Sequence, residues 1–222
     1  MKREDLIVTI DGPAGSGKST IARGLAERLG GRRLDTGAMY RAFAHEAVTR
    51  GIAEDHRALL NLADGFPLTV NAEGRVLVDD RDVTDHIRTP EISSWASKLS
   101  VIPEVRAALV PIQRALALPG PTVAEGRDMG TVVFPDAPVK IFLTASPEAR
   151  AKRRQEELAA QGNPVAFELV LADQIERDAR DENRAVAPLK PAADAALVDT
   201  TEMTIPEVLD FLMAIVDAVG EG

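Results

Sequence analysis

Residues 12–20 read Gly12-Pro13-Ala14-Gly15-Ser16-Gly17-Lys18-Ser19-Thr20, a glycine-rich stretch that fits the pattern G-x-x-x-x-G-K-[ST] at every fixed position. An apolar, β-branched run at 6–10 precedes it and is typical of a buried strand. After it, Ile21, Leu25 and Leu29 recur at helical spacing until Gly30-Gly31. The sequence therefore predicts a strand, a tight turn and a helix in this order.

The residue types of this turn suit the binding of phosphate groups. Glycines let backbone N–H groups converge on phosphate oxygens, and the N-terminus of the following helix adds a partial positive charge. Lys18 can bridge the β- and γ-phosphates of a nucleoside triphosphate, and the Ser19 hydroxyl can bind Mg²⁺. We therefore expect a bound nucleotide rather than a strand-to-helix turn with an incidental lysine.

Four more short runs are typical of buried parallel strands, at 33–35, 122–124, 139–143 and 196–199, and helical patterns lie between them. This alternation predicts an α/β fold, with a five-stranded parallel sheet and helices on both of its faces. In such folds ligands bind at the carboxyl ends of the strands.

The composition of the chain limits its partners. Its 222 residues suit one domain, and a net charge of −9 argues against binding to nucleic acid polymers or anionic membranes. The absence of cysteine excludes disulfides, thiolate zinc sites and a cysteine nucleophile. Because no apolar signal segment precedes the first strand and no transmembrane stretch is visible, we expect a cytoplasmic protein.

One stretch interrupts the strand–helix alternation. The runs 68–70 and 76–78 flank a glycine-containing loop, as in a β-hairpin, and a third short run at 82–84 can join them. We expect a small antiparallel insertion at about 64–88, which the sequence does not distinguish from a surface hairpin.

Helical patterns fill the rest of the chain. One helix begins at Pro103, and Pro111 is expected to kink it or to end it early. Another begins at Ser146-Pro147 and carries Arg150, Lys152, Arg153 and Arg154. A polar helix follows at about 165–183, with Leu169, Ala172 and Ile175 expected on its apolar side. The run 204–207 resembles a capping box before a final, structural helix.

Two clusters of acids and arginines can carry chemistry. Glu125-Gly126-Arg127-Asp128 follows a predicted strand, where an arginine can clamp phosphate and an aspartate can accept from a base or a sugar. An exposed turn with a local ion pair is the alternative. Arg177, Asp181 and Arg184 recur three or four residues apart on one helical face, which by itself suits an exposed helix equally well.

Several classes of P-loop protein fit poorly. The strand at 139–143 has no terminal aspartate for a second Mg²⁺ contact, and no guanine-binding Asn-Lys-x-Asp occurs, which weakens the switch and motor interpretations. His45, His56 and His86 are isolated, without the spacing of a metal site or a catalytic pair, and we expect them to be structural. A kinase with a phosphate acceptor needs no strong base and many cations, which suits the arginine-rich sequence.

Four segments that span nearly the whole chain resemble bacterial cytidylate kinases: residues 11–20, Leu34-Asp35-Thr36-Gly37-Ala38-Met39-Tyr40-Arg41, Glu125-Gly126-Arg127-Asp128-Met129-Gly130-Thr131-Val132-Val133-Phe134-Pro135-Asp136 and Asn183-Arg184-Ala185-Val186-Ala187-Pro188-Leu189. The resemblance implies transfer of the γ-phosphate of ATP to CMP or dCMP, with Mg²⁺, in pyrimidine nucleotide metabolism. It also implies a P-loop kinase core at about 1–35, 110–145 and 185–222, a monophosphate-binding region at about 36–109 that contains the insertion, and a lid at about 146–184.

The resemblance also implies a role for each matching residue. The loop 12–20 holds ATP, with Lys18 on its phosphates and Ser19 on Mg²⁺. Arg153 and Arg154 fall in the mobile lid and, with Lys18 and Arg184, are expected to be catalytic. Nine residues are expected to contact the acceptor nucleotide. Ser97, Arg106 and Asp128 are expected around the cytosine, Arg177 and Asp181 at the ribose, and Thr36 elsewhere on the nucleotide. Arg41, Arg127 and Arg184 are expected at the phosphates.

Two residues depart from the family pattern: Pro111 lies in the helix after Arg106, and Glu182 adds a negative charge beside Asp181. Both bear on acceptor affinity more than on the class of reaction. The alternatives are a kinase of another small acceptor, such as UMP, AMP, dTMP or a non-nucleotide, and a nucleotide-sensing protein without transfer chemistry. We expect a monomer that binds these small molecules.

Overall fold

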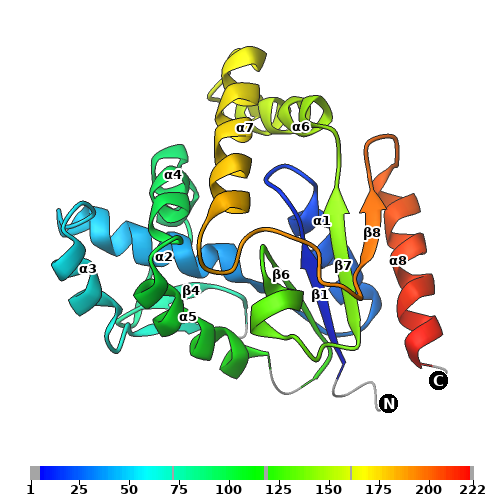
Figure 1. The fold of residues 1–222 in the computed structure, drawn as a ribbon, viewed down its shortest axis with the longest axis horizontal. Helices are drawn as coiled ribbons and strands as arrows, with labels where there is room; N and C mark the ends of the chain where they lie inside the picture. Colours follow the sequence, from blue (N-terminus) through cyan, green and yellow to red (C-terminus); the bar gives the residue numbers. More distant parts are fainter. Residues whose placement is uncertain (1–5, 72, 118–119, 161, 221–222) are drawn as a thin grey trace. The chain divides into compact units, whose positions relative to one another are not determined.

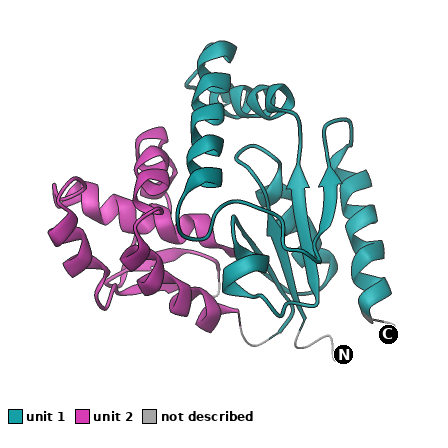
Figure 2. Cartoon of the chain, viewed as in Figure 1, with its two compact units in different colours: residues 1–33, 119–222 teal, residues 34–118 magenta. Residues whose placement is uncertain are grey.

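The chain divides into two compact units (Figure 2), one formed by Met1–Arg33 with Pro119–Gly222 and the other by Leu34–Leu118. The structure is a computed structural model, and it describes residues 6–71, 73–117, 120–160 and 162–220. The predicted phosphate-binding loop lies in the first unit, whereas the predicted insertion lies in the second.

A five-stranded parallel sheet organises the first unit, with the strand order β2-β6-β1-β7-β8. Its strands are β1 (Ile7–Asp11), β2 (Arg32–Asp35), β6 (Thr122–Gly126), β7 (Val139–Thr144) and β8 (Ala196–Asp199). The central β1 pairs with β6 on one side and with β7 on the other, and its residues Val8 and Ile10 are fully buried. The predicted α/β fold is confirmed, and the carboxyl ends of β1, β7 and β8 lie toward the top of Figure 1.

Two helices share one hydrophobic core with this sheet: α1 (Lys18–Arg28) and α8 (Ile205–Gly220). Leu25 of α1 and Leu212 of α8 are fully buried in the same cluster as the sheet residues Val8 and Ile141. The predicted capping box of α8 is confirmed, because the Thr204 backbone N–H donates to the Glu207 carboxylate at 2.8 Å.

Two further helices pack against each other in this unit, α6 (Pro147–Ala160) and α7 (Phe167–Asn183). The Ser146 side chain caps α6 by accepting the backbone N–H of Ala149 at 3.2 Å, as predicted. The prediction that Leu169, Ala172 and Ile175 form the apolar side of α7 is wrong, because all three are exposed.

The buried side of α7 is largely polar. It carries Val170, Gln174, Asp178 and Asp181, spaced three or four residues apart. This face packs against buried polar groups of the same unit, so hydrophobicity alone does not identify it. Apolar periodicity therefore predicted the wrong orientation for the helix.

The second unit combines helices with a small antiparallel sheet. Its helices are α2 (Thr36–Thr49), α3 (His56–Ala63), η2 (His86–Arg88), α4 (Pro90–Leu99) and α5 (Pro103–Leu116), and its strands are β3 (Leu68–Val70), β4 (Val76–Val78) and β5 (Arg81–Asp82). Leu68 pairs with Val78 and Val70 with Val76, which confirms the hairpin, and β5 adds the third strand.

Of the two effects expected of Pro111, a kink or an early end of its helix, the early end does not occur, since α5 continues to Leu116. A proline has no N–H to donate to the carbonyl four residues earlier, so the helix loses one hydrogen bond at that point. Val105, Leu109 and Gln113 are nevertheless fully buried on both sides of the proline. The burial of the apolar Val105 and Leu109 stabilises the helix despite the missing bond.

Candidate active site

The glycine-rich loop joins β1 to α1 with backbone angles that side chains rarely adopt. Gly12 has a φ of 145°, Gly15 of 74° and Gly17 of 87°. A Cβ atom at Gly12 would also overlap the carbonyl oxygen of Leu143 on β7. Glycine is therefore required at these positions for the loop to bend closely over the sheet and to present its N–H groups.

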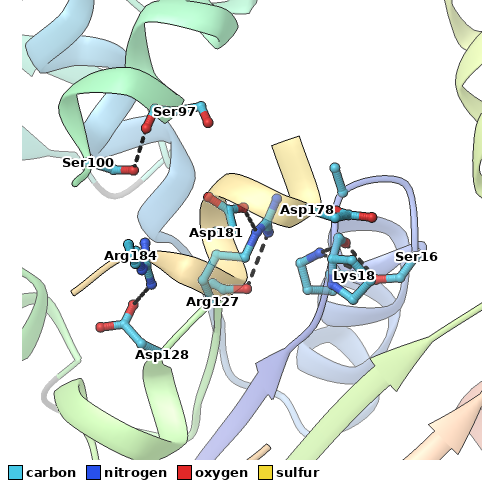
Figure 3. A network of polar contacts seen from close by, with 12 residues as sticks. Ser16, Lys18, Ser97, Ser100, Arg127, Asp128, Asp178, Asp181 and Arg184 are labelled. Carbon is cyan, nitrogen blue, oxygen red and sulfur yellow. Dashed lines mark hydrogen bonds and ion pairs between the residues drawn. The ribbon is translucent and has the colours of Figure 1, made fainter. Parts of the chain in front are cut away.

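Lys18, the first residue of α1, is directed back into the loop (Figure 3). Its Nζ donates to the carbonyl oxygen of Pro13 at 2.5 Å and to the Ser16 hydroxyl at 3.3 Å. Burial, followed by the nearby charge of Arg127, lowers the pKa of Lys18 well below its ordinary value. A buried ammonium held by a carbonyl and a hydroxyl is poorly compensated until an anion arrives.

Ser19 is bonded to a carboxylate that the sequence interpretation left without a role. Its hydroxyl donates to Glu125 Oε2 at 2.8 Å, and Arg33 Nη2 lies 2.5 Å from Glu125 Oε1. Glu125 lies near the carboxyl end of β6, next to β1 in the sheet, so a carboxylate lies beside Ser19 although β7 has no terminal aspartate. Knowledge of the strand order would have identified it.

The Ser19 and Glu125 oxygens suit a magnesium ion. Mg²⁺ prefers hard oxygen ligands and is commonly held by one or two protein groups together with substrate phosphates. Among the described residues, no cluster of three His, Cys, Asp or Glu side chains could hold a metal by itself. The Ser19 and Glu125 oxygens therefore fit an ion that shares its ligands with a bound nucleotide.

Asp11 ends β1 and holds the segment that follows the Arg127-Asp128 pair. Its two carboxylate oxygens accept the backbone N–H groups of Met129 and Gly130, each at 2.8 Å. These residues begin the π-helix η3 (Met129–Val133). Burial raises the pKa of Asp11 to about 6, against the lowering effect of the two backbone hydrogen bonds.

Asp11 should make stability depend on pH. Its folded-state pKa of about 6 exceeds the ordinary 3.8, so the folded protein binds more protons between these values and this contribution to stability falls as pH rises. Relative to Asp11→Asn, the wild type should gain about 1 kcal/mol of unfolding free energy between pH 7.5 and pH 5. Urea titrations of both proteins at several pH values measure this difference. A difference that stays constant with pH would contradict the prediction.

The two acid–arginine clusters meet in the first unit (Figure 3). Arg127 Nε donates to Asp181 Oδ2 of α7 at 2.9 Å, and Arg184 Nη2 lies 3.6 Å from Asp128 Oδ1. The structure thus brings together four of the predicted site residues from segments more than 50 positions apart. The alternative of an exposed turn and an exposed helix is wrong for these pairs, because Asp128, Asp181 and Arg184 are buried.

Arg177 adds another cation to this region. Burial, followed by the nearby charge of Arg127, lowers its pKa below the ordinary value. Its Nε is buried and has no hydrogen-bond partner among the described residues. Cations whose pKa is lowered by burial and by a neighbouring cation indicate a place for an anionic ligand.

The predicted lid arginines contact other groups. Arg153 donates to the carbonyl oxygen of Thr200, after β8, at 2.6 Å and to its hydroxyl at 3.1 Å. Arg154 forms a partly exposed pair with Glu157 at 3.1 Å. Both arginines lie on α6, and their roles on the phosphates stay predictions.

Four of the predicted acceptor residues lie in the second unit. Thr36 begins α2, where Asp35 caps the helix and pairs with Arg41 at 3.2 Å. Arg106 of α5 is buried, and its guanidinium lies 5.7 Å from the centre of the Tyr40 ring. Ser97 of α4 is also buried, and its carbonyl accepts the Ser100 hydroxyl (Figure 3).

Two of the three histidines, which lie far apart in the sequence, contact each other in the structure. His45 of α2 and His86 of η2 stack, with ring centroids 5.8 Å apart, because these two elements pack together. Separation in the sequence hid this contact.

No helix in the described parts of the chain is both long and apolar enough to cross a membrane.

Comparisons with known proteins agree with this geometry. A family model described as cytidylate kinase matches residues 8–218. The curated cytidylate kinase of Methylococcus capsulatus is 46% identical over 215 residues, which cover 96% of this chain and 97% of that protein. The curated cytidylate kinase of Pelotomaculum thermopropionicum is 49% identical over 216 residues, or 95% of this chain and 96% of that protein.

One solved structure, an uncharacterized protein from Eubacterium ventriosum, superposes with a TM-score of 0.53 at 15% identity, covering 97% of this chain and 99% of that one. That likeness supports the fold alone. The family match over nearly the whole chain is independent of it. Taken with the relatives above, it establishes that the chain belongs to the cytidylate kinase family.

Proposed function

We propose that this enzyme transfers the γ-phosphate of ATP to CMP or dCMP by direct in-line attack, giving ADP and CDP or dCDP. Family membership supports the reaction. The observation that carries it at the level of residues is a group of cations around Arg127. Burial, and after it the charge of Arg127, lowers the pKa of both Lys18 and Arg177. Such a site favours several phosphate groups in one place.

The acceptor needs no catalytic base. An oxygen of the CMP phosphate is already anionic, so the protein must position it and stabilise the charge that spreads over the transferred group. Lys18 and the N–H groups of the loop would hold the donor phosphates. The Ser19 hydroxyl, which donates to Glu125, would bind Mg²⁺. The ion would supply further positive charge to those phosphates.

The residues proposed for the acceptor are those that the family resemblance implies. Arg41 and Arg127 would bind the CMP phosphate, and Asp181 with Arg177 would meet the ribose. Ser97, Arg106 and Asp128 would contact the cytosine and Thr36 the nucleotide, while Arg184 would act on the phosphates. The burial of Asp128, Asp181 and Arg184 supports this proposal, since hydrogen bonds to charged groups are strongest where water is excluded.

A panel of acceptors tests the function. With ATP and Mg²⁺, ADP release should be fastest with CMP or dCMP and much slower with UMP, AMP and dTMP. Faster turnover of AMP or dTMP would show a different nucleotide kinase. ATP binding without ADP release on any acceptor would favour a nucleotide sensor instead.

The lid has its own test. Arg153→Ala and Arg154→Ala should each lower kcat by about tenfold or more, because each removes a cation from the phosphates once the lid closes. Lys152→Ala, an exposed lysine on the same helix, is the matched control and should change little. An unchanged kcat in both arginine variants would contradict the lid assignment. Because Arg153 also bonds Thr200, the thermal midpoint of each variant should be measured alongside.

A cytoplasmic location and a monomeric state stay predictions. The absence of cysteine from the sequence suits a reducing compartment.

A further inference from the structure

Arg150 joins three segments of the first unit from a buried position on α6. Its Nε donates to the carbonyl oxygen of Ala145 after β7, at 3.0 Å. Its Nη1 donates to the carbonyl oxygen of Ala14 in the phosphate-binding loop at 3.0 Å, and also to Asp178 Oδ2 of α7 at 2.6 Å. The side chain is 5% exposed, so water competes little for these bonds.

A second contact involves α7, α6 and the phosphate-binding loop. Gln174 of α7 donates from Nε2 to the carbonyl oxygen of Arg150 at 3.3 Å. A Cβ atom at Gly15 would lie only 2.8 Å from that same Nε2. Helix α7 therefore lies directly against the phosphate-binding loop, with Arg150 between the loop and Asp178.

The chemistry of arginine suits such a junction. A guanidinium is planar and always charged, and its N–H groups point in fixed directions, so it can hold several acceptors in one geometry. A buried ion pair contributes little net stability, because removal of both charges from water costs about as much as their attraction returns. Positioning is then a better account of Arg150 and Asp178 than stability is.

Helix α7 also carries residues of the acceptor side. Asp181 lies one turn after Asp178 and binds Arg127, and Arg177 precedes Asp178. A continuous set of bonds and helix backbone therefore runs from Ala14 through Arg150 and Asp178 to Asp181.

We propose that Arg150 is a positioning residue. Together with Asp178 it holds the phosphate-binding loop in the conformation that binds ATP and at a fixed position relative to α7. The proposal rests on the proposed function only for the identity of the acceptor. Arg150 touches neither nucleotide in this role and acts through the loop carbonyl and through α7.

The test measures the donor side without any acceptor. Arg150→Met, Asp178→Asn and the double variant are titrated with a nonhydrolysable ATP analogue and Mg²⁺. Hydrogen exchange of residues 12–17 and the thermal midpoint are recorded for each. Glu176→Gln, which removes a carboxylate from an exposed pair with Arg180 on the same helix, is the matched control for Asp178→Asn.

We expect Arg150→Met to weaken analogue binding by about tenfold or more, since it removes the bonds to the loop and to α7. Asp178→Asn should weaken it by several-fold, since asparagine can still accept a hydrogen bond but carries no charge. The double variant should resemble Arg150→Met, because the two residues act as one unit. Exchange should rise in residues 12–17 while α8 stays protected. Arg150→Lys should restore part of the affinity, and Glu176→Gln should match the wild type.

Analogue binding within twofold of the wild type in both single variants would overturn the proposal, as would losses that simply add in the double variant. A fall in thermal midpoint with raised exchange throughout the unit and unchanged binding would also overturn it, because it indicates a structural role only. If Arg150→Met does not fold, the nearly isosteric Asp178→Asn decides the question. Failure of CMP as an acceptor would refute the proposed function but leave these donor-side results standing.

Discussion

Lys18→Ala is expected to lower kcat for phosphoryl transfer by at least 10²- to 10³-fold, a magnitude typical of the loss of one preorganised charge-stabilising group. Lys18 is the buried cation at the start of α1, and its ammonium is held within the loop by Pro13 and Ser16. On nucleotide binding it would move to the β- and γ-phosphates, where charge develops during transfer. A coupled assay of ADP release with CMP measures the loss.

The control for this variant is Lys140→Met. Lys140 lies on β7 and pairs with the exposed Asp194 at 2.7 Å, and methionine keeps the aliphatic part of its side chain. Because the Asp194 end of the pair is exposed to water, the pair contributes little, so the control should retain kcat and lose at most about 1 kcal/mol of stability. Comparable activity in Lys18→Ala and Lys140→Met would refute the donor role of the loop lysine.

Arg127→Ala is expected to reduce kcat/KM for CMP by about 10²-fold or more. It removes the cation proposed for the acceptor phosphate, and it leaves Asp181, 7% exposed, without its partner at 2.9 Å. Affinity for the ATP analogue should change much less, because Arg127 would touch the acceptor. Steady-state kinetics with CMP varied at saturating ATP, together with analogue titrations, separates the two effects.

Two further variants test whether the loss comes from the guanidinium of Arg127. Arg127→Lys keeps the charge but loses the fork that pairs two oxygens, so it should recover only part of the activity. Arg28→Ala, which breaks an exposed pair between Arg28 of α1 and Asp210 of α8 at 2.6 Å, should behave like the wild type. A fall in ATP affinity equal to the fall for CMP would contradict the assignment of Arg127 to the acceptor.

Local signals in the sequence predicted the fold well. The glycine-rich loop, the apolar runs of the strands and the caps at Ser146 and Thr204 depend on residues close together in the chain, and each appears in the structure as predicted. The resemblance to cytidylate kinases likewise rests on four continuous segments, and the family comparison supports it. These features need no knowledge of which strand lies beside which.

Long-range contacts account for the predictions that failed. Apolar spacing indicated Leu169, Ala172 and Ile175 as the inner face of α7, but that helix buries Gln174, Asp178 and Asp181 instead. Those polar side chains can be buried because Arg150 and Arg127 meet the two aspartates. No pattern within the helix contains that information.

The sequence by itself determined the donor loop, the order of strands and helices along the chain and the family, because these follow from neighbouring residues and their spacing. Only the tertiary structure decided that β6 lies beside β1, and therefore that Glu125 accepts the Ser19 hydroxyl. It also decided that Arg150 joins the loop to α7. The physical reason is that buried charges are stable only beside partners, and here the partners are supplied by segments far apart in the chain.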